Sequence, residues 1–279
     1  MGSWLKRGLA AVGLGKGHEE PQDKLVLTLP DGRKLTQADL VGLAGQMNVK
    51  DGRLVGVTGS VRYEIIGAGN VPSKAHELHE QGRIAGGRAE YTKAIGYFEE
   101  AARLAPEWPY PVYDRAFTHL LMGDAEGART YYAKTVELAP RGFFTAITAL
   151  DSLEKEKAGE LPIGTYLKLL SLEWTHGEER EKLVRELVEQ VPQFAPGWKE
   201  FAGMCESDDE RLRAIEQGLQ AKPDRGTREM LLINKALAMN IKGERNAALQ
   251  LLGELALDPK STLSTEQSAK AAISILTGK

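Results

Sequence analysis

Small and apolar residues recur every three or four positions through most of residues 73–279, which is the spacing of one face of an amphipathic helix. Two segments, AIGYFEEAARLAP and ARTYYAKTVELAP, superimpose at a spacing of 34 residues. Each ends in a proline, which cannot donate a backbone hydrogen bond and therefore stops a helix. The matched positions are Ala94, Phe98, Ala101, Leu104 and Pro106 in the first segment, and Ala128, Tyr132, Thr135, Leu138 and Pro140 in the second.

A second amphipathic stretch precedes each of these segments, at about residues 73–88 and 109–122. Glycines mark the turns between the stretches, at Gly86 and Gly87 in the first unit and at Gly123 in the second. The pattern predicts two helices per period. Because one helical hairpin cannot cover its own apolar stripe, neighbouring hairpins must stack.

The repeated unit resembles the tetratricopeptide repeat family. Residues match its consensus at the small position of the first helix, at the alanine and aromatic positions of the second, and at the final proline; they are Gly82 and Ala116, Ala94 and Ala128, Phe98 and Tyr132, and Pro106 and Pro140. The chain departs from the consensus where the family often has tryptophan (Leu78, Val112) or tyrosine (Ala85, His119). The resemblance implies a mainly α protein, a right-handed α–α superhelical solenoid.

A third match to the repeat lies near the other end, in AALQLLGELALDP, where Ala247, Leu251, Leu257 and Pro259 reproduce the alanine-to-proline spacing. Residues 142–190 predict three helices without a clean repeat, at about 143–157, 162–174 and 178–190. The helical region 73–279 therefore has a degenerate centre, and about twelve helices are expected.

Two further helix starts carry capping signals. Ser207 with Glu210 forms a capping-box signature before a helix that ends near Pro223. The last helix is expected to begin at Ser264, with Gln267 three residues later, and to form the polar terminal cap that a solenoid requires.

Residues 24–72 follow a different pattern and predict a small α+β module with a linker. KLVLTLPDGRKLT alternates apolar and polar residues around the turn sequence Pro30-Asp31-Gly32, which predicts a hairpin. Thr36 with Asp39 predicts a helix that continues through Met47, and the β-rich segment after Gly52 predicts more strand. We expect this module to pack on the first helices or to pair its open strand edge with a partner.

Residues 1–23 are expected to be a flexible or weakly amphipathic terminus. Its apolar residues could share one side of a short helix beside Lys6 and Arg7; they are Trp4, Leu5, Leu9, Val12 and Leu14. The apolar run is short and interrupted by glycine, and lysine at position 6 does not fit a myristoylation signal. These features argue against a membrane anchor.

Composition limits the classes of partner. Lys and Arg number 36 and Asp and Glu 39, so the formal charge of −3 provides no field that would gather nucleic acid. No stretch approaches the ~20 apolar residues that cross a bilayer. The single cysteine, Cys205, suits a reducing compartment, and a cytoplasmic location is expected.

The candidate chemical motifs are weak. Gly67-Ala68-Gly69 is followed by Val71 and Pro72 where a dinucleotide fingerprint needs another glycine, and Cys205 lies on an apolar helical face, as a buried structural cysteine does. His76 and His79 are too few to make a metal site. We therefore expect no enzymatic activity, no catalytic residues, no cofactor and no metal.

The resemblance implies a binding surface, because in tetratricopeptide repeats the first helix of each unit lines a concave groove. The positions concerned, with one acidic neighbour, are His76, His79, Arg83, Tyr110, Tyr113, Asp114 and Phe117. Tyr113 and Phe117 could serve equally as core residues. The lysines and asparagines with which some family members clamp a C-terminal carboxylate are absent, so a mixed aromatic and polar peptide is the expected ligand.

The leading hypothesis is a non-enzymatic scaffold or adaptor that holds a peptide or protein segment in this groove. Two alternatives remain open. The chain could be an accessory subunit of a larger enzyme complex, docked through residues 24–72. It could also be a structural homodimer that associates through the open edge of that module or the final helix.

Overall fold

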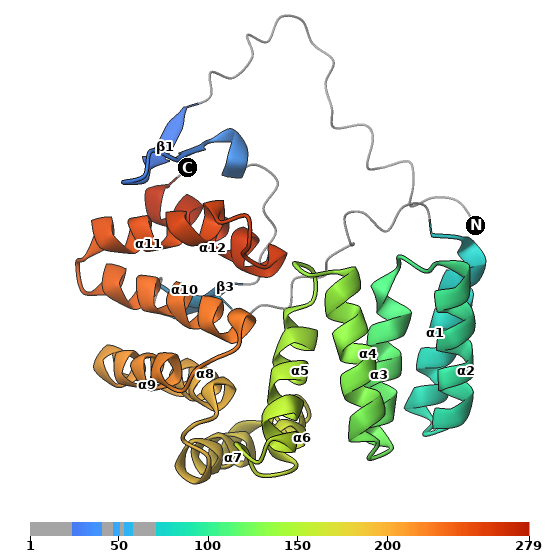
Figure 1. Cartoon of the computed structure of the whole chain (residues 1–279). Coiled ribbons are helices and arrows are strands. Elements are labelled where there is room, and N and C mark those ends of the chain that lie inside the picture. Colours follow the sequence, from blue (N-terminus) through green and yellow to red (C-terminus); the bar gives the residue numbers. More distant parts are fainter. Residues whose placement is uncertain (1–23, 41–46, 51–52, 58–70, 279) are drawn as a thin grey trace, which may run out of the picture.

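The computed structural model describes residues 24–40, 47–50, 53–57 and 71–278. These residues form a curved array of helix pairs with a small strand region at one end (Figure 1). The expected mainly α solenoid is confirmed. The helices are α1 (Ser73–Gly87), α2 (Tyr91–Leu104), α3 (Pro109–Leu121), α4 (Ala125–Leu138), α5 (Phe144–Lys157), α6 (Thr165–Ser171), α7 (Gly177–Gln190), α8 (Ala195–Met204), α9 (Asp208–Gln220), α10 (Arg225–Ile241), α11 (Arg245–Leu257) and α12 (Leu263–Thr277). No described helix has both the length and the apolar character needed to cross a bilayer.

The first two helix pairs pack through the residues that the repeat predicts. Ala94 and Ala128 are fully buried, and the aromatic side chains of Phe98 and Tyr132 lie in the same interfaces. Gly82 lets α1 approach α2 closely, because a methyl group at this position would lie 2.4 Å from the ring of Phe98. The helices α2 and α4 end two residues before their prolines, as expected.

The third predicted repeat is displaced by one residue. In α11 the buried positions are Ala248 and Leu252, whereas the predicted Ala247 is exposed. The helix does end at Leu257, before Pro259. The contacts that α11 makes with α10, α12 and the first strand determine which of its faces is buried.

The three helices predicted for the centre are present, but α6 is short. Gly164 has a φ of +88°, so the helix does not begin until Thr165. The Glu156 side chain of α5 accepts hydrogen bonds from the backbone N–H groups of Gly164 and Tyr166, at 3.0 and 2.7 Å. The predicted cap of α9 is confirmed, because Ser207 Oγ accepts from the N–H of Glu210.

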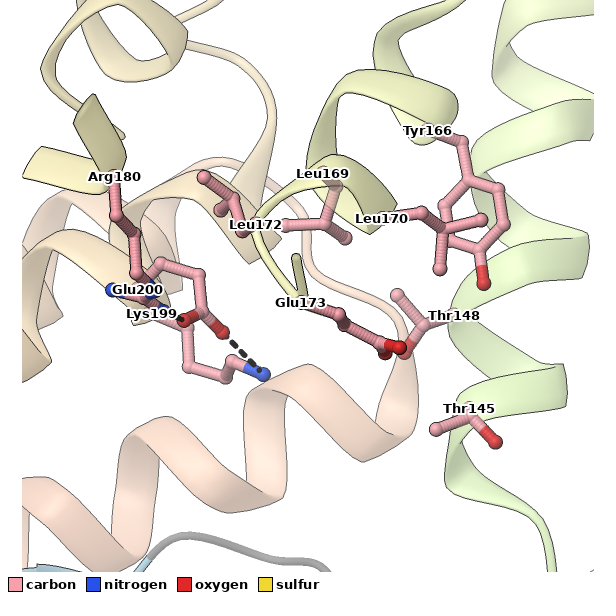
Figure 2. Close-up of a pocket in the computed structure, with 10 residues that line it drawn as sticks. All are labelled: Thr145, Thr148, Tyr166, Leu169, Leu170, Leu172, Glu173, Arg180, Lys199 and Glu200. Atoms are coloured by element: carbon pink, nitrogen blue, oxygen red, sulfur yellow. Dashed lines mark hydrogen bonds and ion pairs between the residues drawn. The ribbon is translucent and has the colours of Figure 1, made fainter. Parts of the chain in front are cut away.

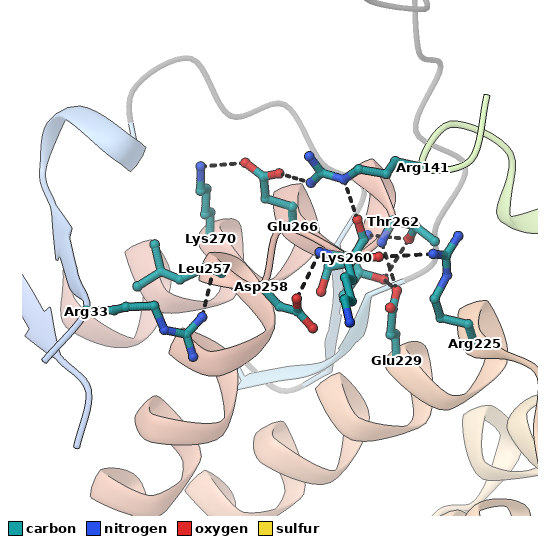
Figure 3. Close-up of polar contacts among 12 residues, drawn as sticks. Arg33, Arg141, Arg225, Glu229, Leu257, Asp258, Lys260, Thr262, Glu266 and Lys270 are labelled. Atoms are coloured by element: carbon teal, nitrogen blue, oxygen red, sulfur yellow. Dashed lines mark hydrogen bonds and ion pairs between the residues drawn. The ribbon is translucent and has the colours of Figure 1, made fainter. Parts of the chain in front are cut away.

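The superhelix turns back on itself, so that α10 packs against α5. Asp224 caps α10 by accepting from the N–H of Thr227, and its Oδ1 also accepts from the Thr148 hydroxyl of α5 at 3.2 Å. A second connection joins the loop before α5 to the start of α12 (Figure 3). There Arg141 donates to the Ser261 carbonyl and to Glu266, while its own carbonyl accepts from the N–H of Leu263.

The N-terminal region contains two antiparallel strand pairs. Strand β1 (Leu25–Thr28) pairs with β2 (Lys34–Thr36) through a turn at Gly32, which confirms the predicted hairpin. Asp39 accepts hydrogen bonds from Thr36 at the start of a short 3-10 helix, η1 (Ala38–Leu40). The prediction that this helix continues through Met47 is wrong, since β3 (Met47–Lys50) begins there and pairs with β4 (Arg53–Val57).

The hairpin packs against the last helices, so the expectation that it packs on the first ones is wrong. Leu35 and Leu40 are buried in one core with α10, α11 and α12, and β4 also contacts α10. Arg33 Nη1 donates to the Leu257 carbonyl at 2.9 Å. The sequence could not predict this packing, because local periodicity does not show which distant helix a strand will cover.

The last helix also differs from its predicted role. It begins at Leu263, and Thr262 caps it by accepting from the N–H of Thr265. Ser264, Thr265 and Ser268 are buried, because α10, α11 and η1 pack around α12. The terminal surface is therefore covered by the N-terminal module. The predictions for residues 1–23 and for the linker at Gly67 to Gly69 lie outside the described residues.

Candidate functional site

The seven predicted groove residues lie on two neighbouring helices, and a polar contact joins the two sets. His76, His79 and Arg83 lie on α1, and the others lie on α3. His79 Nε2 lies 2.7 Å from Asp114 Oδ2, and Arg83 Nε lies 3.9 Å from the same oxygen. Asp114 is therefore the centre of a charged contact that joins the first helices of the first two repeats.

An aromatic row runs along the same side. His76 and His79 contact the ring of Trp108, with centroids 4.5 and 4.9 Å apart. Tyr110 packs edge-on against Phe143 at 5.1 Å. The two histidines thus have an aromatic neighbour, and the described residues contain no group of three His, Cys, Asp or Glu side chains arranged to hold a metal.

Tyr113 is both a packing residue and a polar one. Its ring lies 5.6 Å from Tyr132 and 5.1 Å from Phe143, so it contributes to the core between the helix pairs. Burial raises the pKa of Tyr113 to about 12, although the nearby Thr145 of α5 opposes this, so the hydroxyl is neutral at physiological pH.

A pocket lies between α5, α6, α7 and α8 (Figure 2). The pocket has a volume of about 210 Å³. Apolar side chains of α6 and charged side chains of α7 and α8 face each other across it. Its lining residues are Thr145, Thr148, Tyr166, Leu169, Leu170, Leu172, Glu173, Arg180, Lys199 and Glu200.

Two cations in this pocket share one carboxylate. Lys199 Nζ lies 3.0 Å from Glu200 Oε1, and Arg180 Nη2 donates to Glu200 Oε2 at 2.6 Å. Burial alone would raise the pKa of Glu200 and lower that of Lys199, but their mutual attraction prevails. The pKa of Glu200 is therefore lowered and that of Lys199 is raised, so both remain charged.

Glu173 differs from these three residues. It is exposed at the mouth of the pocket and forms no ion pair with any described residue. Burial of part of its carboxylate, followed by the nearby charge of Glu200, raises the pKa of Glu173. Lys199 is close enough to oppose this rise, but it forms its ion pair with Glu200 rather than with Glu173.

Sequence reasoning missed the pocket, because its residues come from the segment without a clean repeat. One local signal was present: Lys199 and Glu200 are adjacent charges within the otherwise apolar helix APGWKEFAGM.

Cys205, in contrast, behaves as the sequence indicated. It is buried, its Sγ donates to the Phe201 carbonyl, and burial raises the pKa of its thiol to about 11.

Comparison with known proteins finds solved structures that are similar to this chain. No protein-family model and no curated protein sequence matches the chain. MamA from Desulfovibrio magneticus RS-1 is 16% identical, with 66% of this chain and 94% of that one covered and a TM-score of 0.33. The TPR2AB domain of yeast Sti1, in a complex with an HSP90 peptide, is 17% identical over 74% of this chain and 86% of its own, with a TM-score of 0.34.

The protein YrrB, described as a TPR protein with an unusual peptide-binding site, is 14% identical over 68% of this chain and 89% of its own, with a TM-score of 0.31. At these values, similarity neither assigns the chain to a family nor transfers a function. The helical-repeat architecture rests instead on the chain's own packing, described above.

Proposed function

We propose that the chain is a non-enzymatic adaptor of the cytoplasm, which binds an extended or helical segment of another protein, with mixed aromatic and polar side chains, along the surface of α1 and α3. The observation that carries this proposal is that α3 has two adjacent apolar rows. Val112, Ala116 and Leu120 form the core row. The neighbouring row, offset by one residue, bears a stripe at helical spacing formed by Tyr110, Tyr113, Phe117 and Leu121.

This second stripe is only partly covered. Tyr110, Tyr113 and Phe117 are half-buried, and Leu121 is 40% exposed. Arg83 lies exposed on the neighbouring helix, where it approaches Asp114. Partly exposed aromatic residues beside arginine are the composition enriched at binding hot spots, because they provide contact area at small entropic cost.

The groove is a better candidate than the N-terminal module. The apolar side chains Leu27, Leu29 and Leu35 of the hairpin face α10, α11 and α12, so they are engaged within the chain. In the groove, Tyr110 and Tyr113 pack partly against core clusters, whereas Phe117 is half-buried and belongs to none of the described core clusters.

A selection from displayed random peptides, followed by calorimetric titration of the selected peptide, tests the proposal. Phe117→Ala should weaken binding about tenfold, which corresponds to a hot-spot contribution of about 1.4 kcal/mol. Arg83→Glu should weaken binding of the same peptide. Ile275→Ser is the matched control, because Ile275 is 44% exposed but lies on α12. If Phe117→Ala and Arg83→Glu bind the peptide as wild type does, the groove is not the binding surface.

A further inference from the structure

We propose that the pocket between α5, α6, α7 and α8 takes a lysine or arginine side chain of the bound segment. This inference rests on the proposed function, because the pocket adjoins Tyr113 of the proposed groove. Tyr113 of the groove packs against the same core cluster as Tyr166, Leu169 and Leu170, which line the pocket. A segment that lies on α3 and passes Tyr113 therefore comes close to the pocket.

The size of the pocket fits one side chain. Its volume of about 210 Å³ is below the ~300–1,000 Å³ typical of sites for free small ligands. Leu169, Leu170 and the ring of Tyr166 form an apolar wall on α6. The aliphatic stem of a long basic side chain packs well on such a wall, while its head group reaches a polar partner.

The charged residues of the pocket determine whether it binds a cation or an anion. The head groups of Lys199 and Arg180 are both directed to the oxygens of Glu200, so each of these cations already has a partner. Glu173 forms no ion pair with any described residue, and the charge of Glu200, which disfavours its ionised form, outweighs the opposing effect of Lys199. A bound cation would offset the charge of Glu173, whereas a bound anion would be repelled by it.

The residue after Glu173 adds an exposed surface for the neighbour of the basic residue. Trp174 follows Glu173 directly and is 61% exposed. An indole at this position can contact an apolar neighbour of the basic residue, or the cation itself through the face of the ring. The expected recognition element is thus a basic residue beside an apolar one.

The test uses three uncharged-backbone probes, the Nα-acetyl methylamides of lysine, norleucine and glutamate. Binding is followed by the NMR shifts of the Trp174 indole N–H and of the methyl groups of Leu169 and Leu170. The lysine probe should bind more tightly than the norleucine probe, and the glutamate probe least. Glu173→Gln should weaken lysine binding about fivefold, as for loss of one partly exposed ion pair, and bring it to the norleucine level.

Glu178→Gln is the matched control, because Glu178 is also exposed and lies in the first turn of α7, outside the pocket lining. It should leave lysine binding unchanged. Tighter binding of the glutamate probe, equal binding of lysine and norleucine, or an unchanged affinity in Glu173→Gln would each overturn the inference.

This experiment is separate from the test of the groove. A protein that binds the lysine probe but selects no peptide through Phe117 would retain the pocket inference and refute the proposed function. A peptide that depends on Phe117, in a protein whose pocket does not respond to lysine, would give the opposite result.

Discussion

Leu27 of the first strand lies directly over Gly253 of α11, so that a methyl group on Gly253 would lie 2.4 Å from Leu27 Cδ2. Leu29 approaches the same glycine, at 2.8 Å from the same position. The two ends of the described chain are thus joined by a close apolar contact. The hairpin is part of the core at the C-terminal end of the helical array.

Leu35→Ala should therefore destabilise the whole C-terminal part of the chain. Leu35 is fully buried against α10, α11 and α12, and its truncation should lower the free energy of unfolding by about 2–4 kcal/mol. Leu25→Ala on the same hairpin is the control, since Leu25 is 51% exposed and its loss should change stability by at most about 0.5 kcal/mol. Denaturant unfolding with hydrogen exchange of α12 measures both. Unchanged protection of α12 in Leu35→Ala would mean that the hairpin folds separately.

The first repeat offers a matched pair of glycines. Gly82→Ala places a methyl group against the ring of Phe98, and such overpacking costs about 1–3 kcal/mol. Gly96 lies on the exposed side of α2 with no neighbour near its added methyl group, so Gly96→Ala should stabilise the protein by about 0.5–1 kcal/mol. Thermal unfolding of the two variants should shift in opposite directions. A stabilising effect of both would show that α1 and α2 do not approach closely.

The sequence predicts packing within one helical hairpin, but it does not predict packing between segments that are far apart in the chain. Gly82 and Phe98 lie within one helical hairpin, where the resemblance to the repeat placed them at its small and aromatic positions, and the structure shows that they touch. The displaced register at Ala248 was not predictable in the same way, because contacts from α12 and β1 select the buried face of α11. The packing of Leu35 on α12 likewise joins segments that no local pattern relates.

The candidate site also has a part that the repeat pattern predicts and a part that it does not. The groove residues on α1 and α3 could be placed from the repeat, although only the structure shows that Asp114 contacts both His79 and Arg83. The pocket could not be placed, because it forms where α6 is shortened by the turn at Gly164 and α8 brings Lys199 opposite it.

Closure of the superhelix through α5 and α10 depends on Asp224. Asp224→Ala removes the cap of α10 and leaves the buried Thr148 hydroxyl without its acceptor, and together these losses should cost about 2–3 kcal/mol. Ser207→Ala is the control, because Ser207 only caps α9 at the surface and its loss should cost about 1 kcal/mol. Equilibrium unfolding in urea compares the two. Equal losses would show that the bond between α5 and α10 contributes nothing.

The charged and titratable groups near Glu173 define a pH window for lysine-probe binding. Glu200 and Lys199 remain charged through this window, since the pKa of the first is lowered and that of the second is raised. Burial raises the pKa of Tyr113 to about 12 and that of Tyr166 well above its usual value, so both hydroxyls remain neutral. The pocket also contains the guanidinium group of Arg180, which is paired with Glu200. Glu173 is therefore the pocket residue whose charge changes.

Binding of the lysine probe should strengthen as the pH rises through the pKa of Glu173. The ionised carboxylate attracts the ammonium group, which itself stays protonated to about pH 10. Because burial and the charge of Glu200 raise the pKa of Glu173, the midpoint should lie above the usual glutamate value of 4.5. NMR titrations between about pH 4 and 7.5 cover this range. Glu173→Gln should give weak binding that is independent of pH, since a glutamine does not ionise. A wild-type affinity that stays constant over the same range would show that the probe does not sense this carboxylate.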